Sequence, residues 1–306
     1  MNKMRATRYS LLFTVLCLVV GCSTVGPARS AQHTEGPSVP AVSVEVFSSD
    51  PSLADQVLAL NPERIAPEDV SSILSRCPAP RIFNFNGSAF NTMEPFSRFL
   101  MRMGYPEDRI RDPRSGAFAY SSYQSAKDIS EKVSAAYENE KLKPMLIGHS
   151  QGGAFLVKVL HVLKTPCVSF SAAIATGKWM RVLLGQWDML PTLRKIPDTT
   201  EAFTGYRLAG DWIGSDVPLV AESGNYSAEG SALVRNIRLE GVGHLDITQV
   251  ESLADKNEFR ARIDGYTPEK PPQENAKLIF AADIWYHVKK HWCLELQNFI
   301  REHRQA

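Results

Sequence analysis

A serine stands between two glycines in the stretch LIGHSQGG, residues 146–153. Gly148, Ser150 and Gly152 fit the pattern Gly-x-Ser-x-Gly, with an apolar run before it and a helix-like pattern after it. In that context a sharp strand-to-helix turn presents the serine hydroxyl as a nucleophile, and the glycines allow close approach of neighbouring backbone. A serine that only caps a helix would not need both glycines. We therefore predict that Ser150 is a catalytic nucleophile.

A serine hydroxyl is a weak nucleophile at neutral pH, so it needs a general base within hydrogen-bonding reach. His244, in the stretch LEGVGHLDI, follows the last predicted strand in a glycine-flanked loop and is the predicted base. His149 belongs to the turn itself and is not expected to be the base. His287 and His291 are four residues apart near the C-terminus, and we expect them on a solvated helix face rather than at a metal.

The base needs an acid that orients it, and two aspartates lie between Ser150 and His244 in the stretch GYRLAGDWIGSDVP. Asp211 comes directly at the end of a predicted strand, where the backbone holds a side chain more firmly than a loop does, and it is preferred. Asp216, before Val-Pro, is the alternative. Asp246 follows the base too closely and comes in the wrong chain order.

The motif LIGHSQGG and the chain order serine, aspartate, histidine resemble the α/β-hydrolases, particularly the lipase- and esterase-like members, over about residues 80–300. The resemblance implies an α/β-hydrolase fold and a serine hydrolase that cleaves a carboxylic ester through an acyl-enzyme. Three other uses of the scaffold remain as alternatives, namely an acyltransferase, a thioesterase or an amidase. A further alternative is an inactive member that binds ligands in the cell envelope.

The same resemblance implies an oxyanion hole, which is a pair of backbone N–H groups that hold the negative oxygen formed during acyl transfer. One donor is expected from Gln151, directly after the nucleophile, and the other from the loop that follows RIFNFNG. In that loop Asn86-Gly87 replaces the familiar His-Gly, which makes Ser88 the expected second donor.

The elements that would position these residues alternate along the chain. Strands are expected in the stretches RIFNFNG, KPMLIGH, CVSFSAAIAT, FTGYRLAG and ALVRNIRLEGVG, and a short one in DRIRD. Helices are expected at 92–104, 121–140, 151–163 and from about 277 to 304. This alternation predicts an α/β fold with a mostly parallel sheet and helices on both faces, and its chemistry at the carboxyl ends of the strands.

Residues 177–200 form a stretch that is too long for a plain connection and rich in Trp, Met and Leu. One interpretation is a small cap inserted over the site to hold an apolar acyl group. The other interpretation is that it folds as one or two helices packed on the core.

The first 21 residues have the features of a signal peptide, with basic residues followed by the apolar run LLFTVLCLVV. Gly21 before Cys22 resembles the bacterial lipobox, in which the cysteine becomes acylated, for example by palmitate. Residues 22–48 are rich in Ser, Pro, Gly and Ala and are predicted to be a flexible tether. We expect a hydrolase domain at 49–306, anchored to a membrane of the bacterial envelope and facing the periplasm or the exterior.

The composition of the 306 residues, 44% hydrophobic and 22% charged with a net charge of +1, is that of an ordinary globular protein. No block of basic residues suggests a nucleic-acid partner. No phosphate-binding glycine loop or zinc-ligand spacing is present, so we expect no cofactor and no metal. The expected partners are an ester substrate and, through the lipid, a membrane. Cys77, Cys167 and Cys293 permit one disulfide, with no indication of which pair.

Overall fold

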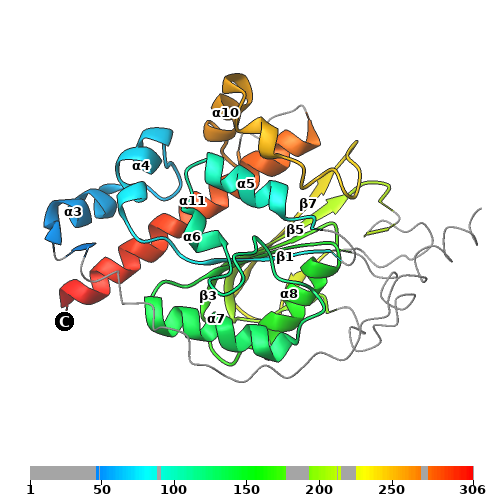
Figure 1. Cartoon of the computed structure of the whole chain (residues 1–306), viewed down its shortest axis with the longest axis horizontal. Coiled ribbons are helices and arrows are strands. Elements are labelled where there is room, and N and C mark those ends of the chain that lie inside the picture. Colours follow the sequence, from blue (N-terminus) through cyan, green and yellow to red (C-terminus); the bar gives the residue numbers. More distant parts are fainter. Residues whose placement is uncertain are drawn as a thin grey trace, which may run out of the picture. The chain divides into compact units, whose positions relative to one another are not determined.

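A five-stranded parallel sheet lies at the centre of the described chain (Figure 1), in the order β1-β2-β3-β5-β7. The computed structural model describes residues 46–47, 49–87, 91–176, 193–211, 213–214, 225–269 and 275–305. The strands are β1 (Ile82–Phe85), β2 (Met145–His149), β3 (Val168–Ile174), β5 (Thr200–Leu208) and β7 (Leu233–Leu239). A second, two-stranded parallel sheet pairs β4 (Lys195–Ile196) with β6 (Ser227–Ala228).

Helices cover both faces of the large sheet. Consecutive strand residues point to opposite sides, so two neighbouring residues join two different cores. Met145 joins the core formed with α3 (Pro51–Ala59), α5 (Glu94–Arg102) and α11 (Ala276–Gln305). Its neighbour Leu146 joins the core formed with α7 (Ala126–Glu140) and α8 (Gln151–Val162). The prediction of a mostly parallel sheet with helices on both faces is therefore confirmed.

The remaining short helices connect these layers. They are α4 (Pro67–Ser72), the 3₁₀ turns η1 (Leu74–Arg76) and η3 (Glu251–Leu253), α6 (Glu107–Ile110) and α10 (Asn257–Asp264). The prediction of a short strand in DRIRD was wrong, because the first three residues of this stretch belong to α6. Pro106 precedes the helix, Glu107 and Asp108 occupy its first turn, and Arg109 lies in its last turn. This charge arrangement favours a helix over a strand.

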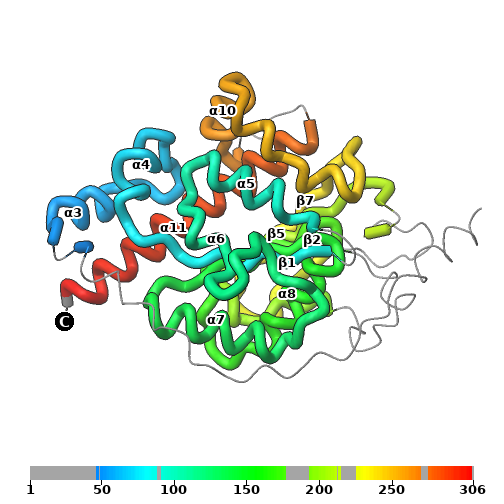
Figure 2. Tube along the Cα trace, viewed as in Figure 1, coloured from blue at the N-terminus to red at the C-terminus, as the bar shows by residue number. Residues whose placement is uncertain are grey.

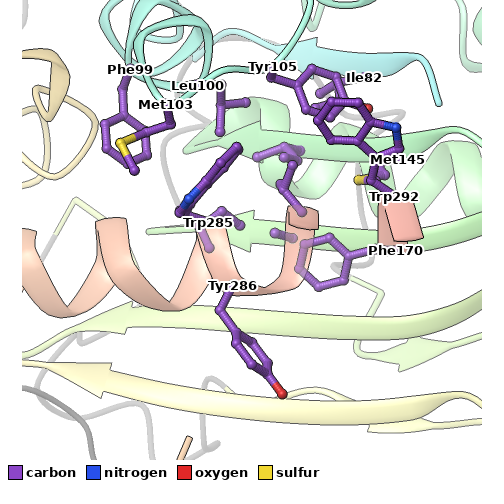
Figure 3. Packing of buried hydrophobic residues seen from close by; sticks show 14 of the residues in the cluster. Ile82, Phe99, Leu100, Met103, Tyr105, Met145, Phe170, Trp285, Tyr286 and Trp292 are labelled. Atoms are coloured by element: carbon purple, nitrogen blue, oxygen red, sulfur yellow. The ribbon is translucent and has the colours of Figure 1, made fainter. Parts of the chain in front are cut away.

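The long helix α11 is buried between the sheet and the N-terminal helices α3 and α4, which run beside it (Figure 2). Gln297 donates hydrogen bonds to the carbonyls of Val57 and Leu60, at 3.0 and 2.9 Å. On the same helix Trp285 packs toward the buried side chains of α5, and Trp292 lies 4.9 Å from the ring of Tyr105 (Figure 3). The helix is therefore enclosed on more than one side.

The expectation that His287 and His291 lie on a solvated face was wrong. Both are buried, 6% and 4% exposed, and both stack on the ring of Phe170 in β3 at 5.0 and 5.2 Å. Burial lowers the pKa of His287 to about 4 and that of His291 to about 3. The four-residue spacing did place the two rings on one helix face, but that face is turned toward the sheet.

Several predictions fall outside the described residues. These are the signal peptide at 1–21, Cys22, the tether at 22–48 apart from residues 46–47, Ser88, Asp216 and residues 177–192 of the suggested cap. The domain limits stay predictions. Cys77, Cys167 and Cys293 are all buried and not joined by a disulfide. Over the part of the chain that the structure describes, no helix has the length and apolarity needed to cross a bilayer.

Candidate active site

The chemistry-bearing residues gather where the parallel strands end. The Ser150 N–H, just past β2, donates to the carbonyl of Ile174 at 2.8 Å, and the Ala209 N–H, just past β5, donates to the carbonyl of Leu239 at 2.7 Å. The hydrogen bonding between neighbouring strands therefore continues one residue past the ends of β2 and β5. The loops that carry Ser150, Asp211 and His244 begin at the same edge of the sheet, as expected for a site at the carboxyl ends of parallel strands.

Ser150 occupies a strained turn between β2 and α8. Its backbone has φ 54° and ψ −120°, a conformation that costs a non-glycine residue about 1–3 kcal/mol. Two glycines make the turn sterically feasible. A Cβ on Gly148 would lie 2.4 Å from the carbonyl oxygen of Gly152, and a Cβ on Gly152 would lie 2.3 Å from that of Phe85. The backbone thus presents the Ser150 hydroxyl away from the strand, at the start of a helix.

The hydroxyl of Ser150 is the first member of a hydrogen-bonded chain. Its Oγ lies 2.8 Å from Nε2 of His244, and Nδ1 of His244 lies 2.7 Å from Oδ2 of Asp211. The carboxylate can only accept, so Nδ1 carries a proton and Nε2 turns its lone pair toward the serine hydroxyl. The structure thus brings together three of the residues singled out in the sequence, in the geometry of a nucleophile, a base and an orienting acid.

The carboxylate of Asp211 is held by its own loop. Its Oδ1 accepts the backbone N–H groups of Ile213 and Gly214, at 3.2 and 2.9 Å, which leaves Oδ2 for His244. A Cβ on Gly214 would lie only 2.2 Å from Oδ2, so this position requires glycine. The side chains of Asp211 and His244 are 3% and 8% exposed. The other acid considered from the sequence, Asp216, lies outside the described residues.

Of the two expected oxyanion donors, Gln151 and Ser88, only Gln151 lies within the described residues. Gln151 is buried and begins α8, so its backbone amide lies at a helix N-terminus beside Ser150, where developing negative charge is favoured. Ser88 lies outside the described residues. The Gly87 N–H donates to Oγ1 of Thr92 at 3.1 Å and is therefore already engaged.

Sequence reasoning missed the polar side chains that fix the loop after β1. Thr92 holds the amide of Gly87, and Oδ1 of Asn86 accepts the N–H of Met93 at 3.1 Å. Short polar residues between a strand and a helix are the signal that could have identified these contacts. Among the described residues, no three His, Cys, Asp or Glu side chains are grouped so that they could hold a metal ion.

Comparisons with known proteins add little beyond this geometry. No family model matches the chain, and no curated protein matches it. Similar solved structures include lipase B of Aspergillus fumigatus, at 14% identity with a TM-score of 0.41, covering 70% of this chain and 63% of that one. The chain therefore spans less than two thirds of that lipase.

Two further solved structures are hydrolases of bacteria. An α/β serine hydrolase without a lid from Xanthomonas campestris is 13% identical, with a TM-score of 0.31. The match covers 63% of this chain and 86% of that chain. An S-formylglutathione hydrolase from Agrobacterium tumefaciens is 9% identical, covers 62% and 84%, and has a TM-score of 0.30. Similarity this low says nothing about activity or substrate, so the function of this chain has to follow from the geometry around Ser150.

Proposed function

We propose that this protein is a serine hydrolase that cleaves a carboxylic ester through an acyl-enzyme. The observation that carries the proposal is the hydrogen-bonded chain from Asp211 through His244 to Ser150, at 2.7 and 2.8 Å. A serine held at φ 54° on a strand-to-helix turn supports the same function, because a surface or capping serine has no need of that strain. The three residues of this chain come from three different loops.

In the proposed reaction His244 takes the proton of the Ser150 hydroxyl as the oxygen attacks the ester carbonyl. Asp211 keeps the imidazole in the tautomer that can accept this proton, and stabilises the imidazolium that forms. The tetrahedral intermediate collapses as His244 returns the proton to the leaving alcohol, which leaves the acyl group on Ser150. Water, deprotonated by His244, then releases the carboxylic acid by the same steps.

The negative oxygen of the tetrahedral intermediate needs hydrogen-bond donors, and we propose the backbone amides of Gln151 and Ser88. The position of Gln151 at the first residue of α8 supports the first assignment. The engagement of the Gly87 amide by Thr92 supports a second donor further along the loop. Each such donor contributes roughly 10²–10³ in rate.

The acyl part of the substrate is proposed to be apolar, and the support is the Trp-, Met- and Leu-rich sequence of residues 177–200. A panel of p-nitrophenyl esters with acyl chains of increasing length tests the proposal. We expect turnover by the wild type and only background with Ser150→Ala. Matched thioester and amide substrates, and an added alcohol acceptor, distinguish a thioesterase, an amidase or an acyltransferase. Equal rates for Ser150→Ala and the wild type would rule out the mechanism.

We also propose that a lipid on Cys22 anchors the protein to a membrane of the bacterial envelope. The support is the basic and apolar leader followed by Gly21-Cys22. A single acyl chain binds membranes only weakly, so stable anchoring requires more than one. Expression of Cys22→Ser in a bacterial host should move the protein from the membrane fraction to the soluble one. Membrane retention of this variant at the wild-type level would contradict the anchor.

A further inference from the structure

A second imidazole lies directly beside the proposed base. His149 is the last residue of β2, immediately before Ser150, and its side chain is completely buried. Its Nε2 lies 2.8 Å from the backbone carbonyl oxygen of His244, and the two rings are 5.0 Å apart with their planes inclined by 49°. The contact joins two residues that are 95 positions apart in the chain. It therefore links the nucleophile turn to the loop of the base.

The chemistry of this contact fixes the protonation of His149. A carbonyl oxygen can only accept, so Nε2 is the donor and carries a proton. Burial, with a smaller contribution from the nearby His244 ring, lowers the pKa of His149 to about 3, although the hydrogen bond to the His244 carbonyl and the charge of Asp211 oppose this shift. The ring is therefore neutral wherever His244 can act as a base, and its Nδ1 is unprotonated. A neutral ring adds no positive charge beside the imidazolium that forms on His244 during the reaction.

The loop that carries His244 is held after the histidine, where the Gly243 carbonyl accepts the N–H groups of Asp246 and Ile247 at 3.1 and 3.3 Å and Ile247 is buried. The residues before the histidine are more open. Gly241 and Gly243 precede the histidine, and Gly241, Gly243, Leu245 and Asp246 are exposed. Gly241 has φ 72° and no atom within 4 Å of the place a Cβ would take. A loop with this composition loses much conformational freedom when it is ordered. The bond from His149 anchors the backbone of the base itself to the buried end of β2.

Three hydrogen bonds then define the position of the base. The imidazole of His244 is bonded to Ser150 and to Asp211, and its main-chain carbonyl is bonded to His149. The ring of His149 also reaches toward the loop after β1. A Cβ on Gly87 would lie 3.6 Å from Nδ1 of His149 and 3.3 Å from Cβ of Ser150. The buried ring next to the nucleophile thus lies near two other loops of the site, the loop of the base and the loop that follows β1.

We propose that His149 is a positioning residue, whose hydrogen bond to the His244 carbonyl holds the base in line between Ser150 and Asp211. The proposal rests on the function proposed above, since it concerns the same reaction. Displacing a reacting group by about 1 Å costs on the order of 10² in rate. Loss of this bond is therefore expected to lower kcat, and to leave KM nearly unchanged because His149 is buried away from bulk solvent and does not hold substrate.

Two substitutions separate the hydrogen bond from the packing. His149→Phe keeps an aromatic ring and removes the donor, whereas His149→Gln restores an N–H group near the place of Nε2. We expect kcat to fall about 10- to 100-fold in the first variant and to recover to within about fivefold of the wild type in the second. Rates are normalised to the sites that a fluorophosphonate titrates, so misfolded protein does not count.

His161→Phe is the matched control. Its Nε2 also lies near a backbone carbonyl, that of Lys195 at 2.9 Å, but at the far end of α8, where the histidine is only half-buried. We expect wild-type kcat in this variant. A wild-type kcat in His149→Phe would overturn the proposal. So would a kcat in His149→Gln as low as in His149→Phe, because the donor would then not be what matters.

The outcomes also separate this proposal from the proposed function. If the wild type hydrolyses no ester, the function fails, and the contact can still be tested by nitrogen NMR of the imidazoles. We expect His149 in the Nε2-protonated form without titration between pH 5 and 9, and a changed His244 signal in His149→Phe. If the wild type hydrolyses esters and His149→Phe has the same kcat, the function stands and the positioning role is refuted.

Discussion

Replacing Asp211 by asparagine tests the orienting role of the acid with almost no change of volume. Oδ1 of Asp211 accepts two backbone N–H groups, from Ile213 and Gly214, while Oδ2 accepts Nδ1–H of His244. An asparagine amide can place its carbonyl oxygen on only one of these two sides, and its NH₂ group then faces the other. If its NH₂ group turned toward the loop, it would face two donors and lose two hydrogen bonds of about 1 kcal/mol each. Its oxygen therefore stays on the loop, and its NH₂ group faces His244.

That orientation forces the wrong tautomer on the base. With a donor facing Nδ1, the neutral imidazole carries its proton on Nε2, and no lone pair remains to take the proton of Ser150. We expect kcat to fall by about 10⁴, which corresponds to about 5 kcal/mol of transition-state stabilisation. KM should change little, because Asp211 has its hydrogen bonds to the protein rather than to substrate.

The assay is steady-state hydrolysis of a p-nitrophenyl ester, with thermal unfolding to establish that the variant is folded. Asp246→Asn serves as the control, since Asp246 is an exposed aspartate two residues beyond His244, and we expect wild-type rates. Asp216→Asn is assayed in parallel as the alternative acid. A folded Asp211→Asn variant that retains more than a tenth of the wild-type kcat, while Asp216→Asn loses activity, would refute the reasoning.

Two further predictions concern the turn and the buried titratable groups. Gly152→Ala would place a Cβ 2.3 Å from the carbonyl oxygen of Phe85, so we expect a loss of about 1–3 kcal/mol in stability together with lower kcat. Gly116→Ala, which has φ 70° and open space around it, should lose about 1 kcal/mol or less and keep its activity, and equal effects on activity would contradict the steric account. His149, His287 and His291 have lowered pKa values of about 3, 4 and 3 in the folded state, so the unfolded chain binds up to three more protons below pH 6.5. Burial raises the pKa of Glu295 to about 7, which offsets one of them, and the free energy of unfolding should fall by about 2 kcal/mol between pH 6.5 and 5.5. Urea unfolding at several pH values measures this slope, and a flat profile would show that these histidines are not buried in neutral form.

The elements nearest the nucleophile could be predicted from sequence because their signals are local. An apolar strand, two glycines around Ser150 and an apolar helix lie within about twenty residues, and β2 and α8 form there. The parallel arrangement of the strands also follows from the alternation of strands and helices. The meeting of Ser150, Asp211 and His244 depends on the parallel register of strands that are far apart in sequence. Chain order alone therefore could not decide between Asp211 and Asp216.

Other features could not be predicted because they depend on which surface an element meets. The spacing of His287 and His291 defines a helix face, but it does not say whether that face meets solvent or β3. The role of His149 is hidden for the same reason, because its partner is a backbone carbonyl in a distant loop. A main-chain acceptor has no signal in the side-chain pattern. Such contacts become visible only once the fold brings the loops together.

The central claim is that Ser150 is the nucleophile of a hydrolase, and covalent labelling tests it most directly. The folded wild type is treated with a fluorophosphonate probe, digested and analysed by mass spectrometry, beside Ser150→Ala. The account predicts one adduct, on the peptide that contains Ser150, and none in the variant. An adduct that persists in Ser150→Ala, or a folded wild type that hydrolyses esters but carries no adduct on Ser150, would contradict it.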